Sequence, residues 1–525
     1  MMSLDFPISQ ARRLFWLTFW GTLVLKILLA AGFPITGDEA FFYQWGVRPA
    51  WGYSDHPPMV GWLFALLHRI SDAPLVLRSV TLLVTSVIGL GLVDALRRIL
   101  AVERAASAWL AGAVYLALPW SWLFVLLTTD TPLLLFMALS AWAYVRANAA
   151  ATQSAGWYAL AGLLVGLAFL SKYFAVLLGL GYAVHVLGWR RDRWWALVLM
   201  FATALPLIAV NLAFNATHGW TNVMFNVFNR NEGGHWNLKT PVVYVLMVAY
   251  LFTPWLLWQA GRAKGASNAA GALGTAGVSA NTRRALAVLW LFPILLFAVI
   301  SLRRTIGLHW LLGFVPLFVA WAALRLDAAA LRRSWRWNLW LGLPHLVLVA
   351  AIAWAPLAWW QASPLHERAV FLRKTPVLVA ALQQDMPAGA TLMARTYNPA
   401  AMLAFHHQPY VPVFGVGRHH ARQDDLQVDF RQFDGQTLRI FDYNPPDLAD
   451  FAPYFERVSQ RQWVIDGVAF YAVDGVGFRY APYRNTVLAA IAREFHQVPH
   501  WLPVLGSPFC ERYGFAECSP SPRTP

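Results

Sequence analysis

The sequence predicts a polytopic α-helical membrane protein that ends in a small mixed α/β domain. Of its 525 residues, 58% are hydrophobic and 13% are charged, whereas soluble globular proteins carry about 25% charged residues. Eleven apolar runs are candidate membrane-spanning helices. After residue 360 the hydropathy falls, and short runs of β-branched and aromatic residues replace the long apolar ones.

The candidate spans follow from the need for about 20 apolar residues to cross a bilayer. They are 13–33, 73–96, 106–127, 131–146, 156–171, 173–189, 194–213, 241–260, 285–301, 309–325 and 337–359. Several are short, and 156–171 with 173–189 could form one helical hairpin whose tip enters the membrane. The first run follows Arg12 and Arg13 and has no small-residue cleavage site, so we expect a retained helix.

The net charge of +15 comes mainly from basic residues in alternate gaps between the spans, a distribution typical of membrane topology and not of nucleic-acid binding. The positive-inside rule puts the amino terminus and the arginine-rich gaps in the cytoplasm. The opposite side then receives the loop 34–72, a turn at 128–132, the tip at Lys172, the loop 214–240, Arg303 and Arg304, and all residues after about 361.

The segment 361–525 is predicted to be a domain exposed outside the membrane, beside a transmembrane domain that covers 1–360. The runs TLMART, YVPVFGV, TLRIFDY and QWVIDGVAFYAVDG predict strands, and PVLVAALQQD and TVLAAIAREF predict helices. The two cysteines of the chain, Cys510 and Cys518, both lie here. On this side of the membrane they can form a disulfide or remain two free thiols.

The stretch 37–58, GDEAFFYQWGVRPAWGYSDHPP, carries more chemistry than a connecting loop needs. It holds Asp38, Glu39, Asp55 and His56 among many aromatic residues. Carboxylates beside a membrane are costly to desolvate, so the adjacent pair indicates a reactive or ligand-holding site. The alternative is a solvated acidic loop, and Asp55 with His56 could belong to an ordinary turn.

Other ionisable residues fall on the same predicted side. Asp130 could cap the helix that follows it, and Lys172 could snorkel or hold an anionic head group. His218 and His309 could each bind a ligand or have a structural role. Paired arginines on the non-cytoplasmic side are unusual by the positive-inside rule, so we expect Arg303 and Arg304 to bind phosphate.

Acids and bases on one outer face suit a substrate that is half lipid and half polar. A sugar linked to a lipid phosphate fits, because its phosphate is the leaving group and needs cationic stabilisation. The hydroxyl that attacks the sugar needs a carboxylate base. We therefore expect these residues to line one cavity.

Four segments resemble, in order, bacterial glycosyltransferase family 39. They are GDEAFFYQWGVRPAWGYSDHPPMVGWL, TTDTPLLLFMALSAW, GLAFLSKYFAVLL and NLAFNATHGW. This family is related to dolichyl-phosphate-mannose protein mannosyltransferases and to the aminoarabinose transferase of lipid A, and the likeness covers about residues 13–325. In the tail, RTYNPAAMLAFHHQPYVPVFG and GRHHARQDDLQVDF resemble the periplasmic end of bacterial members.

The resemblance implies the C-type membrane glycosyltransferase fold in the bacterial inner membrane, with a polyprenyl-phosphate-linked sugar donor. It implies inverting transfer on the periplasmic face to lipid A, another glycolipid, a polysaccharide or a protein. By motif position Asp38 is the catalytic base, Glu39 lies beside it, and Asp130 positions the base or the acceptor. The residues expected to bind substrate are Asp55, His56, Lys172, Tyr173, His218, Arg303, Arg304 and His309.

Some relatives use a divalent metal, for which His218, Glu39, Asp55 and His56 could be ligands. No tight ligand spacing is present, so the use of a metal stays open. A transporter or flippase for lipid-linked sugars is the alternative function. It predicts charges deep in several spans and an internal repeat, whereas the spans hold little beyond Lys26 and Asp94, and no repeat is visible. A non-catalytic scaffold would leave the acidic loop unexplained.

Overall fold

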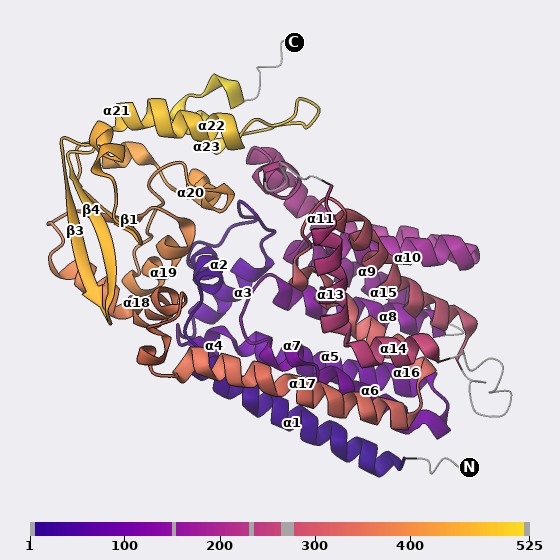
Figure 1. Cartoon of the computed structure of the whole chain (residues 1–525). Helices are drawn as coiled ribbons and strands as arrows, with labels where there is room; N and C mark the ends of the chain where they lie inside the picture. Colours follow the sequence, from indigo (N-terminus) through magenta and orange to yellow (C-terminus); the bar gives the residue numbers. More distant parts are fainter. Residues whose placement is uncertain (1–5, 150–153, 230–235, 264–277, 519–525) are drawn as a thin grey trace, which may run out of the picture. The chain divides into compact units, whose positions relative to one another are not determined.

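The computed structural model describes residues 6–149, 154–229, 236–263 and 278–518. The chain divides into two compact units. The first comprises Met1–Gly32, Ala73–Ala209 and Gly233–Ala351, and the second comprises Phe33–Asp72, Val210–Glu232 and Ile352–Pro525. Helices build the first unit, and the sheet belongs to the second (Figure 1). The predicted boundary near residue 360 stays a prediction.

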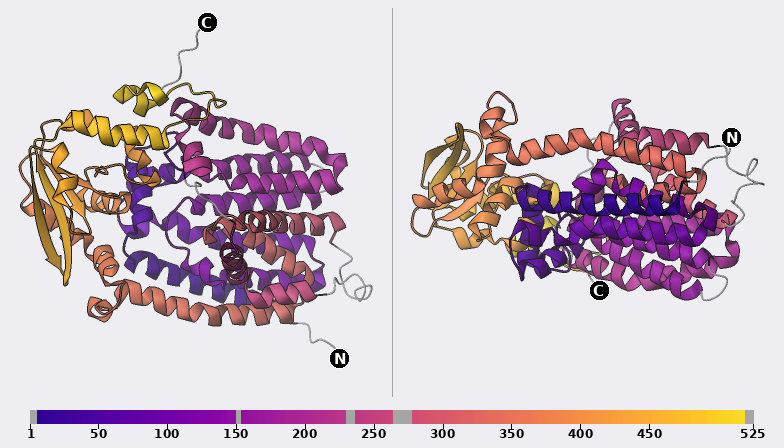
Figure 2. Two further views of the ribbon diagram at one scale, coloured as in Figure 1. Left: turned by 45° about the horizontal axis from the view of Figure 1, so that its top comes forward. Right: turned by 90° about the horizontal axis from the view of Figure 1, so that it is seen from below.

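The first unit is a bundle of long apolar helices, many of which lie alongside one another (Figure 2). Its main helices are α1 (Ile8–Gly32), α5 (Ser79–Ile99), α6 (Ala105–Leu116), α8 (Asp130–Ala149), α9 (Ser154–Ser171), α10 (Ala175–Trp189), α11 (Trp194–Thr217), α13 (Lys239–Phe252), α14 (Pro254–Arg262), α15 (Ala280–Ser301), α16 (Val315–Arg325) and α17 (Ala328–Trp354). Short helices α4 (Pro74–Leu77) and α7 (Pro119–Leu123) complete it. The predicted spans lie on these helices, with ends that differ by several residues.

Two predicted spans are broken where proline follows a non-helical residue. The run 106–127 forms α6 and α7, because Leu118 is extended and Pro119 starts a new helix. The run 241–260 forms α13 and α14, which meet at an angle of 84°. The break lies at Thr253, whose φ of 59° ends the first helix before Pro254.

Within the described residues, seven helices are long and apolar enough to cross a membrane, or eight if the bent pair counts as one span. The predicted spans 106–127, 131–146 and 173–189 are helical but fall outside this set. The chain is therefore a multi-pass α-helical membrane protein, and the total of eleven spans stays a prediction.

Arginines that the topology assigns to the cytoplasm gather at one end of the first unit. Arg12 and Arg97 both lie over the Trp109 ring, 5.8 and 5.6 Å from its centre. Arg104 and Arg325 donate hydrogen bonds to backbone carbonyl oxygens at helix ends, where cations are favoured by the helix dipole. These four arginines are thus held by aromatic rings and helix ends of the first unit, and the topology stays a prediction.

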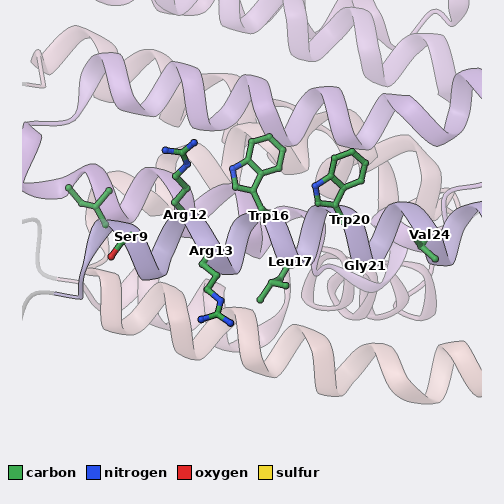
Figure 3. Close-up of a pocket in the computed structure, with 9 residues that line it drawn as sticks. Ser9, Arg12, Arg13, Trp16, Leu17, Trp20, Gly21 and Val24 are labelled. Atoms are coloured by element: carbon green, nitrogen blue, oxygen red, sulfur yellow. The ribbon is translucent and has the colours of Figure 1, made fainter.

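The outer surface of α1 carries a shallow groove of about 1010 Å³. Arg12 and Arg13 lie at its amino-terminal end, and Trp16, Leu17 and Trp20 follow along the helix (Figure 3). Basic residues followed by tryptophan and apolar side chains are typical of a helix that enters a bilayer from its polar surface. This arrangement is typical of a membrane span, and the retention of the helix stays a prediction.

The second unit contains a four-stranded sheet with the order β1-β2-β4-β3. Its strands are β1 (Thr391–Ala394), β2 (Leu438–Asp442), β3 (Arg457–Ile465) and β4 (Val468–Val476). The pair β1 and β2 is parallel, and the other pairs are antiparallel. The hairpin between β3 and β4 turns at Asp466 and Gly467, both with positive φ, as a tight turn of this kind requires. The predicted C-terminal mixed α/β domain is confirmed.

One predicted strand is wrong. The run YVPVFGV forms no strand but a single bridge between Val413 and Ala394. Pro412 has no N–H group to donate to a ladder, which shortens the pairing. The other three runs lie on β1, on β2 and on the hairpin of β3 and β4.

Helices cover the sheet and connect it to the acidic stretch. They are α18 (His366–Gln384), α19 (Tyr397–His407), α20 (Arg422–Gln427), α21 (Tyr480–Tyr483), α22 (Ala489–Phe495) and α23 (Pro508–Tyr513). Two further helices, α2 (Gly37–Val47) and α3 (Met59–His68), come from the predicted loop 34–72. Helix α2 packs against both α3 and α19, so the acidic stretch and the tail share one body.

The contact between α2 and α3 depends on Gly46. A Cβ atom at this position would lie 2.4 Å from Cβ of Phe64 and 2.7 Å from its carbonyl carbon. We expect Gly46→Ala to lower the free energy of unfolding by about 1–3 kcal/mol, the usual cost of overpacking. Gly91→Ala in α5 is the control, because its Cβ meets nothing within 4 Å and helix propensity favours alanine. Thermal unfolding in detergent compares the two, and equal midpoints would contradict the packing argument.

Candidate active site

The two acids at the start of α2 have different environments. Thr36 is the N-cap, and Glu39 completes a capping box with it: the Thr36 N–H donates to Oε2 of Glu39 at 3.2 Å. Glu39 is 1% exposed, whereas Asp38 is exposed in the first turn. The structure therefore engages Glu39 in the cap and presents Asp38 at the surface of the second unit.

The loop after α2 is held by Tyr53. Its ring stacks on Trp45 at 4.3 Å between centroids, and its hydroxyl donates to the Trp45 carbonyl oxygen at 2.8 Å. The Tyr53 N–H in turn donates to the His56 carbonyl oxygen at 3.1 Å. A turn is thus present, as one interpretation of the sequence expected, but it is packed onto the helix that carries Asp38.

Asp55 is 2% exposed within this turn. Its Oδ2 lies 3.3 Å from Nδ1 of His420, a residue of the C-terminal domain. Burial would raise the pKa of Asp55, but the charges of His56 and His420 and the His420 hydrogen bond bring the pKa below its usual value. Asp55 is therefore held as a buried carboxylate between two imidazoles.

The segment that follows α11 supports the same turn. Asn226 donates its Nδ2 hydrogen to the Asp55 carbonyl oxygen at 2.9 Å, and Asn222 donates to that of Tyr53 at 3.2 Å. His218 lies nearby in the chain, stacked on Phe214 at 4.1 Å. Burial lowers the pKa of His218, which favours the neutral ring. This environment suits a structural role, and its role in substrate binding stays a prediction.

Asp130 and Lys172 form a buried ion pair in the first unit, which was not predicted from the sequence. Nζ of Lys172 lies 2.9 and 3.0 Å from the two carboxylate oxygens of Asp130. Their side chains are 7% and 10% exposed, so Lys172 does not snorkel to a polar surface. Asp130 begins α8, and Lys172 with Tyr173 lies at the tip between α9 and α10. The charge of each group compensates that of the other.

The remaining predicted residues follow α15. Arg303 is exposed and lies 4.9 Å from the centre of the Trp236 ring, while Arg304 is half-buried. Among the described residues, no carboxylate lies within ion-pair distance of either arginine. His309 is exposed beside Trp310. The positive charge of this segment is therefore not compensated by the described part of the chain.

A cavity of about 20 Å³ lies beside the loop, lined by residues of α2, α19 and α20. Its volume is enough for about one water molecule. Asp424 lines it and accepts hydrogen bonds from Tyr410 and from the Val413 N–H. Burial raises the pKa of Asp424 to about 7. Asp424, His420 and Gln423 were not predicted as substrate-binding residues, although the segment GRHHARQDD, which contains them, is part of the resemblance.

The proposed metal ligands do not converge. Glu39 is engaged in a helix cap, and His218 in bonds to its own helix. In the part of the chain that the structure describes, no group of three or more histidine, cysteine, aspartate or glutamate residues could hold a metal ion. Among the described residues, the predicted ligands therefore form no metal site, and the use of a metal stays open.

Comparison with known proteins tests the resemblance. Residues 55–220 match the family model described as dolichyl-phosphate-mannose-protein mannosyltransferase. Over 225 residues the chain is 29% identical to lipid A galacturonosyltransferase RgtD of Rhizobium johnstonii, a match that covers 42% of this chain and 45% of that relative. The predicted resemblance to glycosyltransferase family 39 is confirmed. The family match contains Asp55, Asp130 and Lys172, whereas Asp38 and Glu39 lie before it.

The fold is confirmed by a solved structure, that of ArnT from Cupriavidus metallidurans bound to undecaprenyl phosphate. It aligns with a TM-score of 0.61 over 87% of this chain and 97% of that one, at 15% sequence identity. The chain therefore has the fold of the C-type membrane glycosyltransferases.

The buried ion pair gives a stability prediction. We expect Lys172→Met to lower the free energy of unfolding by about 3–5 kcal/mol, because it removes the ammonium group that Asp130 contacts in a buried pair. The double variant Asp130→Asn with Lys172→Met should recover most of this loss. Lys374→Met is the control, since it removes an exposed pair with Asp466 worth about 0–1 kcal/mol. Thermal unfolding in detergent measures all three, and a double variant no more stable than the single one would contradict the pairing.

Proposed function

We propose that this chain is an inverting membrane glycosyltransferase that moves a sugar from a polyprenyl-phosphate donor to an extracytoplasmic acceptor. The family match, the fold of an ArnT bound to undecaprenyl phosphate and the likeness to a lipid A galacturonosyltransferase support this reaction class. Lipid A or another envelope glycolipid is the favoured acceptor, since RgtD is named for lipid A. The arginine cluster of the first unit supports an orientation in the inner membrane with the site facing the periplasm.

The exposed position of Asp38 is the observation that carries the mechanism. Glu39 uses its carboxylate to cap α2, whereas the Asp38 side chain is accessible. In the proposed reaction the acceptor hydroxyl attacks the anomeric carbon of the donor, and Asp38 takes the hydroxyl proton. The bond between that carbon and the phosphate oxygen breaks, so that polyprenyl phosphate leaves with the electron pair and the new glycosidic bond has inverted configuration.

The departing phosphate needs positive charge, which Arg303 and Arg304 would supply. Lys172 is the further candidate. Its ammonium group has three N–H donors, and Asp130 accepts in the observed pair. Asp130 would thus keep Lys172 charged and fixed at the tip of the α9 and α10 hairpin while a remaining N–H donates to the phosphate.

Replacement of the proposed base tests the mechanism. We expect Asp38→Asn to reduce sugar transfer by about 10²–10⁴-fold, the contribution of a general base, with donor binding retained. Glu39→Gln should reduce transfer less, because glutamine also serves in a capping box. Glu494→Gln in α22 removes an exposed carboxylate and is the matched control. The assay measures release of polyprenyl phosphate by purified protein in lipid nanodiscs, with a panel of polyprenyl-phosphate sugars and lipid A acceptors.

Full transfer by Asp38→Asn would show that another group is the base. If the wild-type protein binds the donor but never cleaves it with any acceptor, transport of lipid-linked sugar becomes the favoured function.

A further inference from the structure

The C-terminal domain contacts the turn that carries Asp55 and His56 at two points. Gln423 of α20 accepts a hydrogen bond from the Ser54 N–H through its Oε1 at 2.9 Å. His420, just before α20, places Nδ1 at 3.3 Å from Oδ2 of Asp55. The two contacts join residues separated by 369 and 365 positions in the chain. The tail thus holds both the backbone and the side chain of this turn.

Two of the side chains in these contacts are buried, whereas that of His420 is 29% exposed. Asp55 is 2% and Gln423 is 3% exposed. The other carboxylate oxygen of Asp55 and the hydroxyl of Ser54 have no hydrogen-bond partner among the described residues. His420 therefore supplies a hydrogen bond to the Asp55 carboxylate, while His56 contributes its charge. A buried carboxylate that loses such a partner either takes up a proton or leaves its position.

The imidazole of His420 is itself fixed by aromatic neighbours. It lies 4.7 Å from the Tyr397 ring of α19 and 5.1 Å from the Phe225 ring. The Tyr397 ring also contacts Phe41 of α2 at 5.4 Å. The same helix, α19, thus packs on the helix that bears Asp38 and on the histidine that contacts Asp55.

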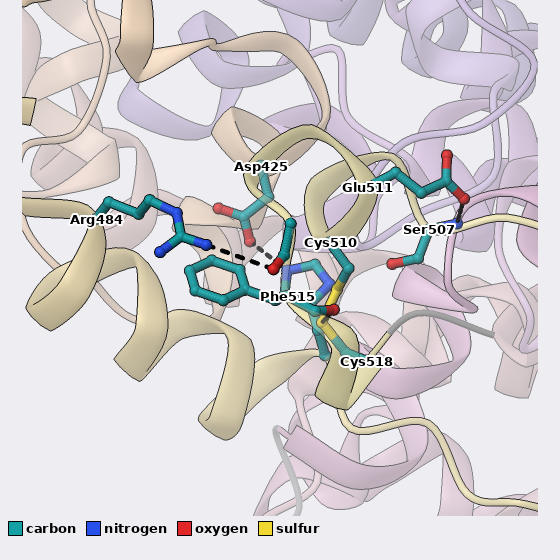
Figure 4. Close-up of a disulfide and its surroundings, with 9 residues drawn as sticks. Asp425, Arg484, Ser507, Cys510, Glu511, Phe515 and Cys518 are labelled. Carbon is teal, nitrogen blue, oxygen red and sulfur yellow. Dashed lines mark hydrogen bonds and ion pairs between the residues drawn. A yellow bond between two sulfur atoms is a disulfide. The ribbon is translucent and has the colours of Figure 1, made fainter. Parts of the chain in front are cut away.

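Helix α20 is anchored in turn by the end of the chain. Oδ2 of Asp425 lies within hydrogen-bond distance of Nε2 of His496, at 2.7 Å. Arg512 of α23 donates to the carbonyl oxygens of Asp425 and Val428 at 3.0 and 2.7 Å. The disulfide between Cys510 and Cys518 closes the segment that contains Arg512. Figure 4 shows this disulfide close to Asp425. The sequence left the state of these cysteines open, and the structure pairs them.

We propose that His420 and Gln423 are positioning residues of the transferase, so that the C-terminal domain completes the site by holding the turn with Asp55 and His56. The proposal rests on the proposed function in so far as this turn binds substrate. His420 keeps the Asp55 carboxylate charged and in place, and Gln423 fixes the backbone that precedes it. His56, the next residue, is half-exposed and would then be presented in one orientation.

Several other titratable groups face this pair and enter any pH dependence. His56 lies on the same turn and contributes to the low pKa of Asp55. His419 adjoins His420, with ring centres 4.5 Å apart, and Tyr397 faces it from α19. On α20 the ionisable groups are Arg422, Asp424 and Asp425.

Paired substitutions at His420 test the proposal. His420→Phe removes the hydrogen bond and keeps a ring, whereas His420→Asn keeps an N–H donor close to the position of Nδ1. We expect His420→Phe to lower kcat/KM by at least 10-fold, and His420→Asn to restore most of it. In His420→Phe the pKa of Asp55 should rise, so the acidic limb of the pH–rate profile should move to higher pH. His500→Phe, at an exposed histidine of the same unit, should leave both unchanged.

Hydrogen exchange of residues 49–58 provides a readout that does not need activity. His420→Phe and Gln423→Leu should both speed exchange in this turn in the purified, lipid-embedded chain, and His420→Asn should not. If the turn loosens but the wild-type protein transfers no sugar, the proposed function fails and the structural coupling stands. If exchange, kcat/KM and the pH profile of His420→Phe all match the wild type at an unchanged unfolding temperature, the positioning role is wrong.

Discussion

A carboxylate that is 2% exposed has to be compensated by its neighbours, and in the second unit Asp55 imposes this requirement. The charges of His56 and His420 compensate the carboxylate. Asn226 holds the backbone of the turn through the Asp55 carbonyl oxygen, and Tyr53 ties the turn to α2. Because these partners come from distant parts of the chain, the turn can form only when the acidic stretch, the segment after α11 and the C-terminal domain are assembled. The buried charge therefore links local chemistry to the fold of the whole unit.

In the first unit, buried charges are compensated by a single ion pair. Asp130 and Lys172 are both buried, and each is the counter-charge of the other. Taking two such ions out of water costs several kcal/mol per ion, which an ion pair recovers only with good geometry. The pair joins the start of α8 to the tip between α9 and α10, so it fixes the relative position of two helix ends. A similar logic applies to Lys26, whose Nζ donates to Thr85 and to the Leu82 carbonyl oxygen. That arrangement suits a structural residue and gives no support to a transport pathway.

The sequence predicted those features that depend on local pattern. Hydropathy located the helices, and β-branched and aromatic composition located the run that forms the hairpin of β3 and β4. Prediction failed where a single proline or a contact between distant residues determines the local structure. Thr253 with Pro254 breaks a run that is apolar throughout, and YVPVFGV has strand composition but pairs only at Val413. In the candidate site, the pairing of Asp130 with Lys172 and of Asp55 with His420 spans 42 and 365 residues. Local sequence patterns carry no information about contacts between residues so far apart in the chain. The candidate residues could therefore be predicted, but their partners could not.

The division of roles between Asp38 and Glu39 bears on why a carboxylate would suffice as the proposed base. Consecutive residues in the first turn of a helix point about 100° apart, so one can cap while its neighbour faces outward. A carboxylate can accept a proton at neutral pH, but it is a weak base. A weak base is adequate when the leaving group is a phosphate, because most of the barrier lies in breaking the bond to the sugar, and the hydroxyl proton is transferred late. The chemistry would then depend less on the basicity of Asp38 than on its position relative to the sugar. That position is set by α2, which packs on α3 through Gly46 and on α19 of the C-terminal domain.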